Sequence, residues 1–211
     1  MMPVGSVVLV IVAVAALFGL LHRVLDRMGL TDWGAALWIG LIIGGGYVNL
    51  VLVRTPELRI NIGGAVIPLL LAAFLLRHAD TGVERGRAVM ATLLTGVLVF
   101  GMGKLLPDDP GAMLIDPLWA FALTAGIVAY LLGRSRRSAF IAGTLGIVTA
   151  DLLQYAEVAT QGLRARIWIG GGGAFDAVII AGIVAVGVAE IVGEVRERFH
   201  RRQRVTLEEA P

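Results

Sequence analysis

Long apolar runs alternate with short polar segments along the chain, and this pattern predicts seven membrane-spanning helices. Most runs approach the roughly 20 residues that a helix needs to cross a bilayer. The third and sixth runs are shorter, so we expect them to extend into polar flanks or to be partly irregular. No basic segment precedes the first run, which therefore predicts a retained helix rather than a cleaved signal. The predicted spans are residues 4–22, 33–53, 62–76, 88–106, 112–132, 138–155 and 172–193.

Composition agrees with a membrane protein. Hydrophobic residues make up 57% of the 211 residues and charged residues only 16%, whereas soluble domains are about 25% charged. The chain has no cysteine, which excludes disulfides and thiol chemistry. We predict an all-α integral membrane protein, with residues 1–195 as a single transmembrane helical domain and 196–211 as a basic cytoplasmic tail. The expected partner is the lipid bilayer, with no cofactor and no nucleic acid.

Basic residues are distributed unequally between alternate loops. One set of loops, together with the C-terminal tail, holds 13 of the 18 lysines and arginines. Cytoplasmic loops are enriched in these residues, so we expect the N-terminus outside and the C-terminus in the cytoplasm. The other set, predicted to lie outside, holds the remaining five: Arg54, Arg59, Lys104, Arg164 and Arg166.

Polar residues within the spans fall at one depth, near the predicted outer ends. Each such residue costs free energy unless it faces the bundle interior, a cavity or a partner. At about 1.5 Å per helical residue, the acids of the sixth and seventh spans lie at matching depths. The inner part of the spans is almost purely apolar. The residues of this predicted outer site are Asn49, Asn61, Asp116, Asp151, Gln154 and Asp176.

Glycine runs fall at the same layer, and the longest is "GGGGAFD", which ends in Asp176. Runs of three or four glycines form helices poorly. Irregular backbone at membrane depth is tolerated where it lines a cavity, so Gly172 and Gly173 are predicted to lie at the site. The four glycines then predict a loosened helix entrance that presents the Asp176 carboxyl group.

Helix-end chemistry gives a competing structural explanation for two of the acids. Asp116 and Asp176 lie near predicted helix N-termini, where a carboxylate caps free N–H groups and favours the helix dipole. Asp151 lies near a helix C-terminus, where a carboxylate is electrostatically unfavourable. Asp151 is therefore the acid for which the sequence most strongly predicts a functional role.

Two acids at one depth on neighbouring helices suit an aspartyl dyad, in which one carboxyl group activates a water and the other polarises a carbonyl. The pattern resembles the intramembrane aspartyl proteases, which carry one Asp in the sixth helix and a second after a Gly-x-Gly motif opening the seventh. The resemblance implies that Asp151 and Asp176 are the catalytic pair and that a transmembrane peptide is the substrate. Here, however, Ala174 and Phe175 separate the glycines from Asp176, and the chain lacks the family's later Pro-Ala-Leu helix.

Two other function classes remain open. Asp116, Asp151 and Asp176, with Asn and Gln oxygens, could bind a proton or a hard cation in a coupled transporter; which metal, if any, the sequence leaves unknown. In a scaffold or assembly factor, the same polar layer would serve packing alone. The sequence also leaves the oligomeric state open.

Three segments, "NIGGAVIP", "DPLWA" and "GGGGAFDAVIIAGI", together resemble a prokaryotic membrane family catalogued as domain of unknown function sixteen-fourteen. The resemblance implies a multi-pass protein of the prokaryotic inner membrane. It implies no reaction. It does suggest that the segments holding Asn61, Asp116 and Asp176 are shared features of such proteins.

Overall fold

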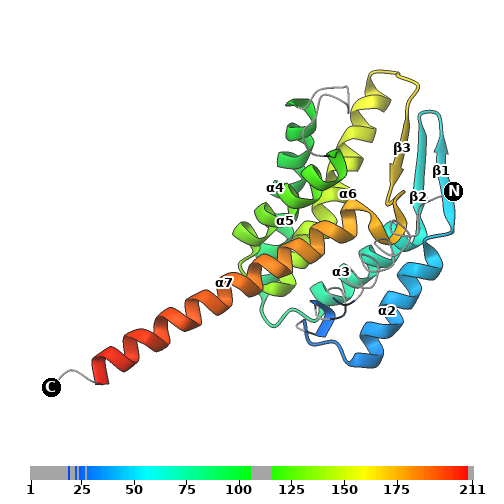
Figure 1. The fold of residues 1–211 in the computed structure, drawn as a ribbon. Coiled ribbons are helices and arrows are strands. Elements are labelled where there is room, and N and C mark those ends of the chain that lie inside the picture. The colour runs from blue at the N-terminus through cyan, green and yellow to red at the C-terminus, as the bar shows by residue number, and fades with distance from the viewer. Residues whose placement is uncertain (1–18, 20–21, 23, 27, 106–115, 209–211) are drawn as a thin grey trace, which may run out of the picture.

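The computed structural model of the chain describes residues 19, 22, 24–26, 28–105 and 116–208. These residues are mostly helical, as the sequence predicts, with a small sheet added (Figure 1). In chain order, the elements are α2 (Asp32–Gly45), β1 (Asn49–Arg54), β2 (Glu57–Asn61), η1 (Ile62–Val66), α3 (Ile67–Arg77), α4 (Gly82–Leu105), α5 (Pro117–Gly133), α6 (Arg136–Thr160), β3 (Arg166–Ile169), η3 (Gly173–Phe175) and α7 (Ala177–Glu208).

Helix α6 is the central element of the bundle. It packs against α3, α4, α5 and α7, and its first four turns are almost entirely buried. Small residues allow the close approach: Gly146 of α6 lies against Thr95 of α4, and Gly96 of α4 lies against Thr149 of α6. A side chain at either glycine would collide with the facing threonine, so reciprocal small residues set the α4–α6 distance.

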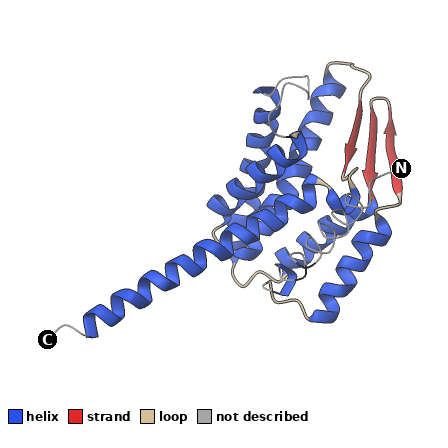
Figure 2. Ribbon diagram, viewed as in Figure 1, coloured by secondary structure: helices blue, strands red, loops and turns tan. Residues whose placement is uncertain are grey.

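The sheet has the order β1-β2-β3 and lies along one side of the helices (Figure 2). Strands β1 and β2 form an antiparallel hairpin, and β2 pairs with β3 in parallel, with Glu57 opposite Arg166. Leu58, Ile167 and Ile169 are buried and belong to the apolar core. Every residue of β1 is exposed.

The sheet corrects the prediction for the second span. The expected helix over residues 33–53 ends at Gly45, and Asn49–Arg54 is a strand. Consecutive glycines at 44–46 disfavour helix, while Val51 and Val53 favour an extended chain that can pair with β2. The apolar run is therefore a short helix followed by a strand.

The third and sixth spans behave as their short lengths suggested. The third begins irregularly, as the π-helix η1, and continues as α3. The sixth extends into polar flanks at both ends and becomes the 25-residue α6. The seventh helix begins at Ala177 rather than at residue 172, and its backbone continues through most of the predicted tail to Glu208.

The remaining spans are only partly described. Residues 88–105 of the fourth span lie in α4, and the fifth span corresponds to α5, which begins at Pro117. Residue 106 of the fourth span and residues 112–115 of the fifth lie outside the described residues. Most of the first span, residues 4–22, lies outside the described residues. Within the described part, α4 and α6 are long and apolar enough to cross a membrane, and the other apolar helical stretches, including Ala177–Gly193 of α7, are shorter.

Candidate functional site: an acid-lined cavity

Asp176 occupies the junction between the glycine run and α7. The backbone there turns through Gly170 and Gly173, which both have positive φ, and forms the short 3-10 helix η3. One Asp176 oxygen, Oδ1, accepts the Val178 N–H at 2.9 Å, and Oδ2 accepts the Gly172 N–H at 2.9 Å. Asp176 therefore caps α7 from the position just before its first residue, rather than lying within the helix as predicted.

Asp151 faces the same region from α6, which packs against α7. Within the described residues, no hydrogen-bond donor reaches the Asp151 carboxyl group. The two acids thus differ in their local environment. Two backbone N–H groups hold the Asp176 carboxyl group in place, whereas the Asp151 carboxyl group faces a space in the protein.

That space is a cavity of about 420 Å³, which we call the acid cavity. It lies between α4, α5, α6, β3 and the start of α7. Its wall combines apolar side chains with a few charged and amide groups, an arrangement common in binding and catalytic sites. The lining residues are Val99, Phe100, Gly103, Lys104, Phe121, Ile147, Ala150, Asp151, Gln154, Trp168, Asp176 and Ala177.

Lys104 supplies the positive charge of the acid cavity. Its ammonium group pairs with Glu157, one turn beyond Gln154 on α6, and lies 5.1 Å from the centre of the Phe100 ring. The ion pair connects the C-terminal turn of α4 to α6 across the cavity. The Lys104–Glu157 pair is neutral as a whole, so it does not offset the charge of the two acids.

Three of the predicted site residues meet at the cavity, and five do not line it. Asp151, Gln154 and Asp176 are lining residues. Asp116 is exposed and caps α5 by accepting the Leu118 N–H at 2.9 Å. Gly172 and Gly173 form the turn behind Asp176, and the remaining two, Asn49 and Asn61, belong to a separate cluster.

This second cluster, which we call the asparagine junction, comprises Asn49, Asn61, Gly46, Gly64 and Trp168. Asn61 is 1% exposed. Its Nδ2 donates to Asn49 Oδ1 and to the Gly46 carbonyl, both at 2.8 Å, and its Oδ1 accepts the Gly64 N–H at 2.7 Å. Trp168 Nε1 also donates to Asn49 Oδ1 at 3.2 Å. The cluster connects α2, the three strands and η1. Its hydrogen bonds give both asparagine side chains a structural role.

The aromatic wall of the acid cavity was not predicted from the sequence. Phe100, Phe121 and Trp168 come from three elements that are distant along the chain. For Trp168, the sequence offered one usable signal, because this aromatic residue lies two positions before the glycine run. Its role became visible only with β3, a strand that the apolar pattern did not predict.

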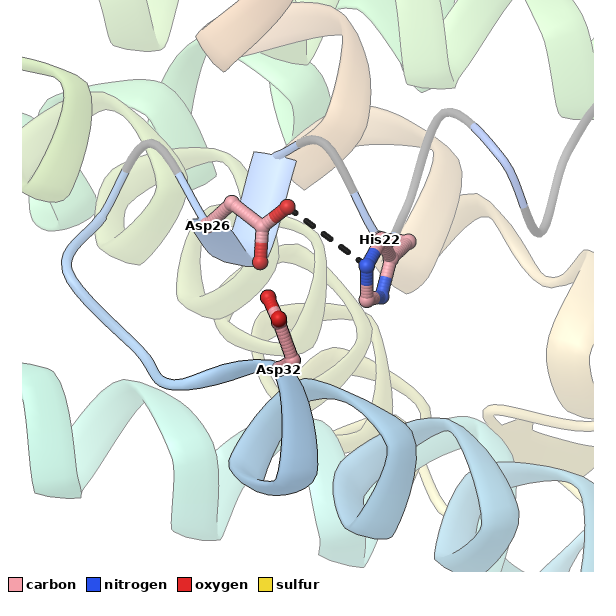
Figure 3. A group of neighbouring side chains, drawn as sticks. All are labelled: His22, Asp26 and Asp32. Atoms are coloured by element: carbon pink, nitrogen blue, oxygen red, sulfur yellow. Dashed lines mark ion pairs between the residues drawn. The ribbon is translucent and has the colours of Figure 1, made fainter.

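A group of potential metal ligands lies elsewhere, before and at the start of α2. His22, Asp26 and Asp32 point toward one another (Figure 3), and their ligand atoms lie within 4.8 Å of one another. His22 Nε2 is 3.5 Å from Asp26 Oδ2. Both aspartates are exposed, and exposed acidic groups of this kind occur commonly without a metal, so the group carries no metal assignment.

One comparison with known proteins identifies a family. A family model described as "Protein of unknown function (DUF1614)" matches residues 38–188, more than half of the chain. The match includes the asparagine junction and the acid cavity. It contains nothing that relates the chain to the intramembrane aspartyl proteases. No curated protein and no solved structure matches the chain.

Proposed function

This chain belongs to the DUF1614 family of proteins of unknown function, and from that premise we propose that it is a multi-pass prokaryotic membrane protein that hydrolyses membrane-embedded peptides. The acid cavity would be the active site, with Asp151 and Asp176 as the catalytic pair. One observation carries the proposal: acids from α6 and from the start of α7 line one cavity.

The outward-facing surface of the bundle supports a membrane location. Large apolar side chains are exposed on α2, α3, α4, α5 and α7. Soluble monomers rarely expose continuous apolar patches of this kind, whereas lipid tails solvate them without cost. Helix α4 provides the fullest example, with exposed Val83, Val89, Met90, Leu93, Leu94, Val97, Leu98 and Leu105.

Orientation can be tested with single cysteines, because the chain has none of its own. We expect a Thr55→Cys variant, in the β1–β2 turn, to react with a membrane-impermeant maleimide on intact spheroplasts. A Gly82→Cys variant, at the start of α4, should react only after the membrane is permeabilised. The opposite pattern would invert the proposed topology, and equal labelling of both sites in intact spheroplasts would contradict a spanning bundle.

The hydrogen bonds around the pair support different roles for the two acids. Hydrogen bonds from N–H groups stabilise a carboxylate, and Asp176 accepts two, so it is assigned as the base that takes a proton from water. Asp151, with no donor among the described residues, is assigned as the acid that donates a hydrogen bond to the scissile carbonyl oxygen.

In this reaction, the water oxygen bonds to the carbonyl carbon while its proton passes to Asp176. The tetrahedral intermediate then collapses, the C–N bond breaks, and the leaving nitrogen takes the proton that Asp176 accepted from water, which returns Asp176 to its carboxylate form. The products are a new carboxyl terminus and a new amine. Phe100, Phe121 and Trp168 would hold apolar side chains of the substrate.

The test is cleavage of a reporter transmembrane helix by the purified protein in proteoliposomes. Asp151→Asn and Asp176→Asn should each abolish cleavage, because each removes one member of the pair. Asp116→Asn is the matched control: it makes the same change outside the cavity, and Asn remains a good helix cap. Cleavage retained by either dyad variant would sink the protease assignment.

Proton- or cation-coupled transport is the second candidate, favoured by the side-chain oxygens of Asp151, Asp176 and Gln154 around one cavity. The transport hypothesis in its three-acid form also requires Asp116, which does not line that cavity. Asp116→Asn therefore separates the two proposals: a three-acid ion site predicts impaired ion uptake, and the hydrolase predicts no change. Ion uptake that depends on all three acids, without peptide cleavage, would establish transport instead.

A further inference from the structure

Four arginines converge at the tip of the sheet, on the side of the molecule predicted to be poor in basic residues. Arg54 ends β1 and Arg59 lies in β2. Arg164 precedes β3 and Arg166 begins it. The parallel pairing of Glu57 with Arg166 brings together segments 109 residues apart. Four of the five basic residues that the sequence places outside thus gather at one point.

Three of these arginines, Arg54, Arg164 and Arg166, line an open pocket of about 460 Å³, which we call the arginine pocket. Its charged lining residues are Arg54, Glu57, Arg164 and Arg166, and the Thr55–Pro56 turn closes one side. The pocket shares none of its lining residues with the acid cavity. It is therefore a separate feature from the proposed active site.

Glu57 organises the arginine pocket without neutralising it. Its Oε2 accepts Arg166 Nε at 2.9 Å, and its Oε1 accepts Arg59 Nε at 2.5 Å. The hydrogen bond from Arg166, and to a smaller extent that from Arg59, holds the pKa of Glu57 below its ordinary value. The carboxylate therefore remains charged and keeps Arg166 in place. Within the described residues, no acidic side chain pairs with Arg54 or Arg164.

Three guanidinium groups and one carboxylate thus leave the arginine pocket with net positive charge. Guanidinium groups bind phosphate oxygens through two parallel N–H donors, a geometry that a lysine ammonium cannot offer. We propose that the arginine pocket binds a phosphate-bearing anion, with Arg54 and Arg164 as its direct ligands and Arg166 positioned by Glu57. Soluble phosphate compounds and anionic lipid headgroups share this chemistry.

The test measures binding to the full-length protein in two settings. Inorganic phosphate is titrated into detergent-solubilised protein by calorimetry at constant ionic strength. Phosphatidylglycerol retention is measured by native mass spectrometry from vesicles of phosphatidylglycerol and phosphatidylcholine. Because hydrogen bonds to charged groups are worth about 1.5–3 kcal/mol, the double variant Arg54→Gln/Arg164→Gln should bind at least about 100-fold more weakly.

Two further variants test whether binding depends on the guanidinium groups of the arginine pocket rather than on positive charge in general. Arg77→Gln/Arg87→Gln removes the same charge from exposed positions on α3 and α4, away from the pocket, and should bind as the wild type does. Arg54→Lys/Arg164→Lys retains the charge without the planar donors and should bind with intermediate affinity. Thermal unfolding of each variant confirms that the fold is intact.

The outcomes are distinct. Phosphate binding that is lost only in the Arg54/Arg164 variant supports a soluble ligand. Selective retention of phosphatidylglycerol without phosphate binding, lost in the same variant, supports a lipid headgroup. If the wild type binds neither probe, or if the Arg77/Arg87 variant loses as much binding as the Arg54/Arg164 variant, the proposal is overturned.

Discussion

The asparagine junction and the acid cavity begin from the same sequence feature and reach opposite outcomes. Both consist of polar residues placed at one depth in an apolar chain. At the junction, Asn61 is buried, and its amide makes three hydrogen bonds. At the cavity, Asp151 faces open space, with no donor to its carboxyl group among the described residues.

The difference separates two uses of polarity in an apolar environment. A buried polar group with its hydrogen bonds satisfied specifies how segments join. A polar group that faces a cavity, without a protein partner, is available to a substrate or a ligand. Matched depth predicts which residues come together, and hydrogen bonding then distinguishes the structural cluster from the candidate active site.

The largest expected effect comes from the close backbone contact at Gly64, a member of the asparagine junction. A side chain at Gly64 would collide with the Gly170 carbonyl oxygen, which belongs to the backbone and cannot move aside cheaply. We expect Gly64→Ala to destabilise the protein by about 4 kcal/mol or to prevent folding. The measurement is thermal unfolding in detergent, followed by circular dichroism.

Gly187→Ala is the control for this prediction. Gly187 lies in α7 with no atom within 4 Å of an added Cβ, so alanine should be neutral or stabilising by up to about 1 kcal/mol. If Gly64→Ala unfolds at the same temperature as Gly187→Ala, the close packing of η1 against the glycine run is wrong.

The next effect is smaller and tests the junction itself. Asn61→Ala removes three hydrogen bonds and leaves the buried Gly64 N–H unsatisfied, so we expect a loss of about 3 kcal/mol of unfolding free energy. Asn49→Ala, at an exposed position, should lose about 1 kcal/mol. Equal effects of the two substitutions, measured by the same unfolding assay, would contradict the structural role assigned to Asn61.

Part of this arrangement was predictable from the sequence. The apolar pattern predicted the helices, and the depth of the polar residues brought Asp151 near Asp176 and Asn49 near Asn61. Helix-end rules anticipated the capping roles found for Asp116 and Asp176. The predictions that Asp151 acts in catalysis and that Asn61 binds a ligand remain predictions.

The sheet could not be predicted, because apolar strands and apolar helices look alike in a short run. The stretch from Val48 to Val53 continues the apolar run of α2. It does not alternate between apolar and polar residues, because β1 has no buried face and all of its residues are exposed. The parallel pairing of β2 with β3 joins segments more than 100 residues apart, and no local signal encodes it. The aromatic wall and the arginine pocket both include residues of β3, so they could not be predicted for the same reason.

The smallest expected change in stability tests the central claim most directly. Because Asp151 accepts no hydrogen bond from the described residues, Asp151→Asn should alter the free energy of unfolding by less than about 1 kcal/mol. The same preparation should lose at least about a thousandfold in reporter-helix cleavage. A stable, inactive Asp151→Asn protein is the result we predict. Undiminished cleavage, or a loss of cleavage that merely parallels a loss of folded protein, would contradict it.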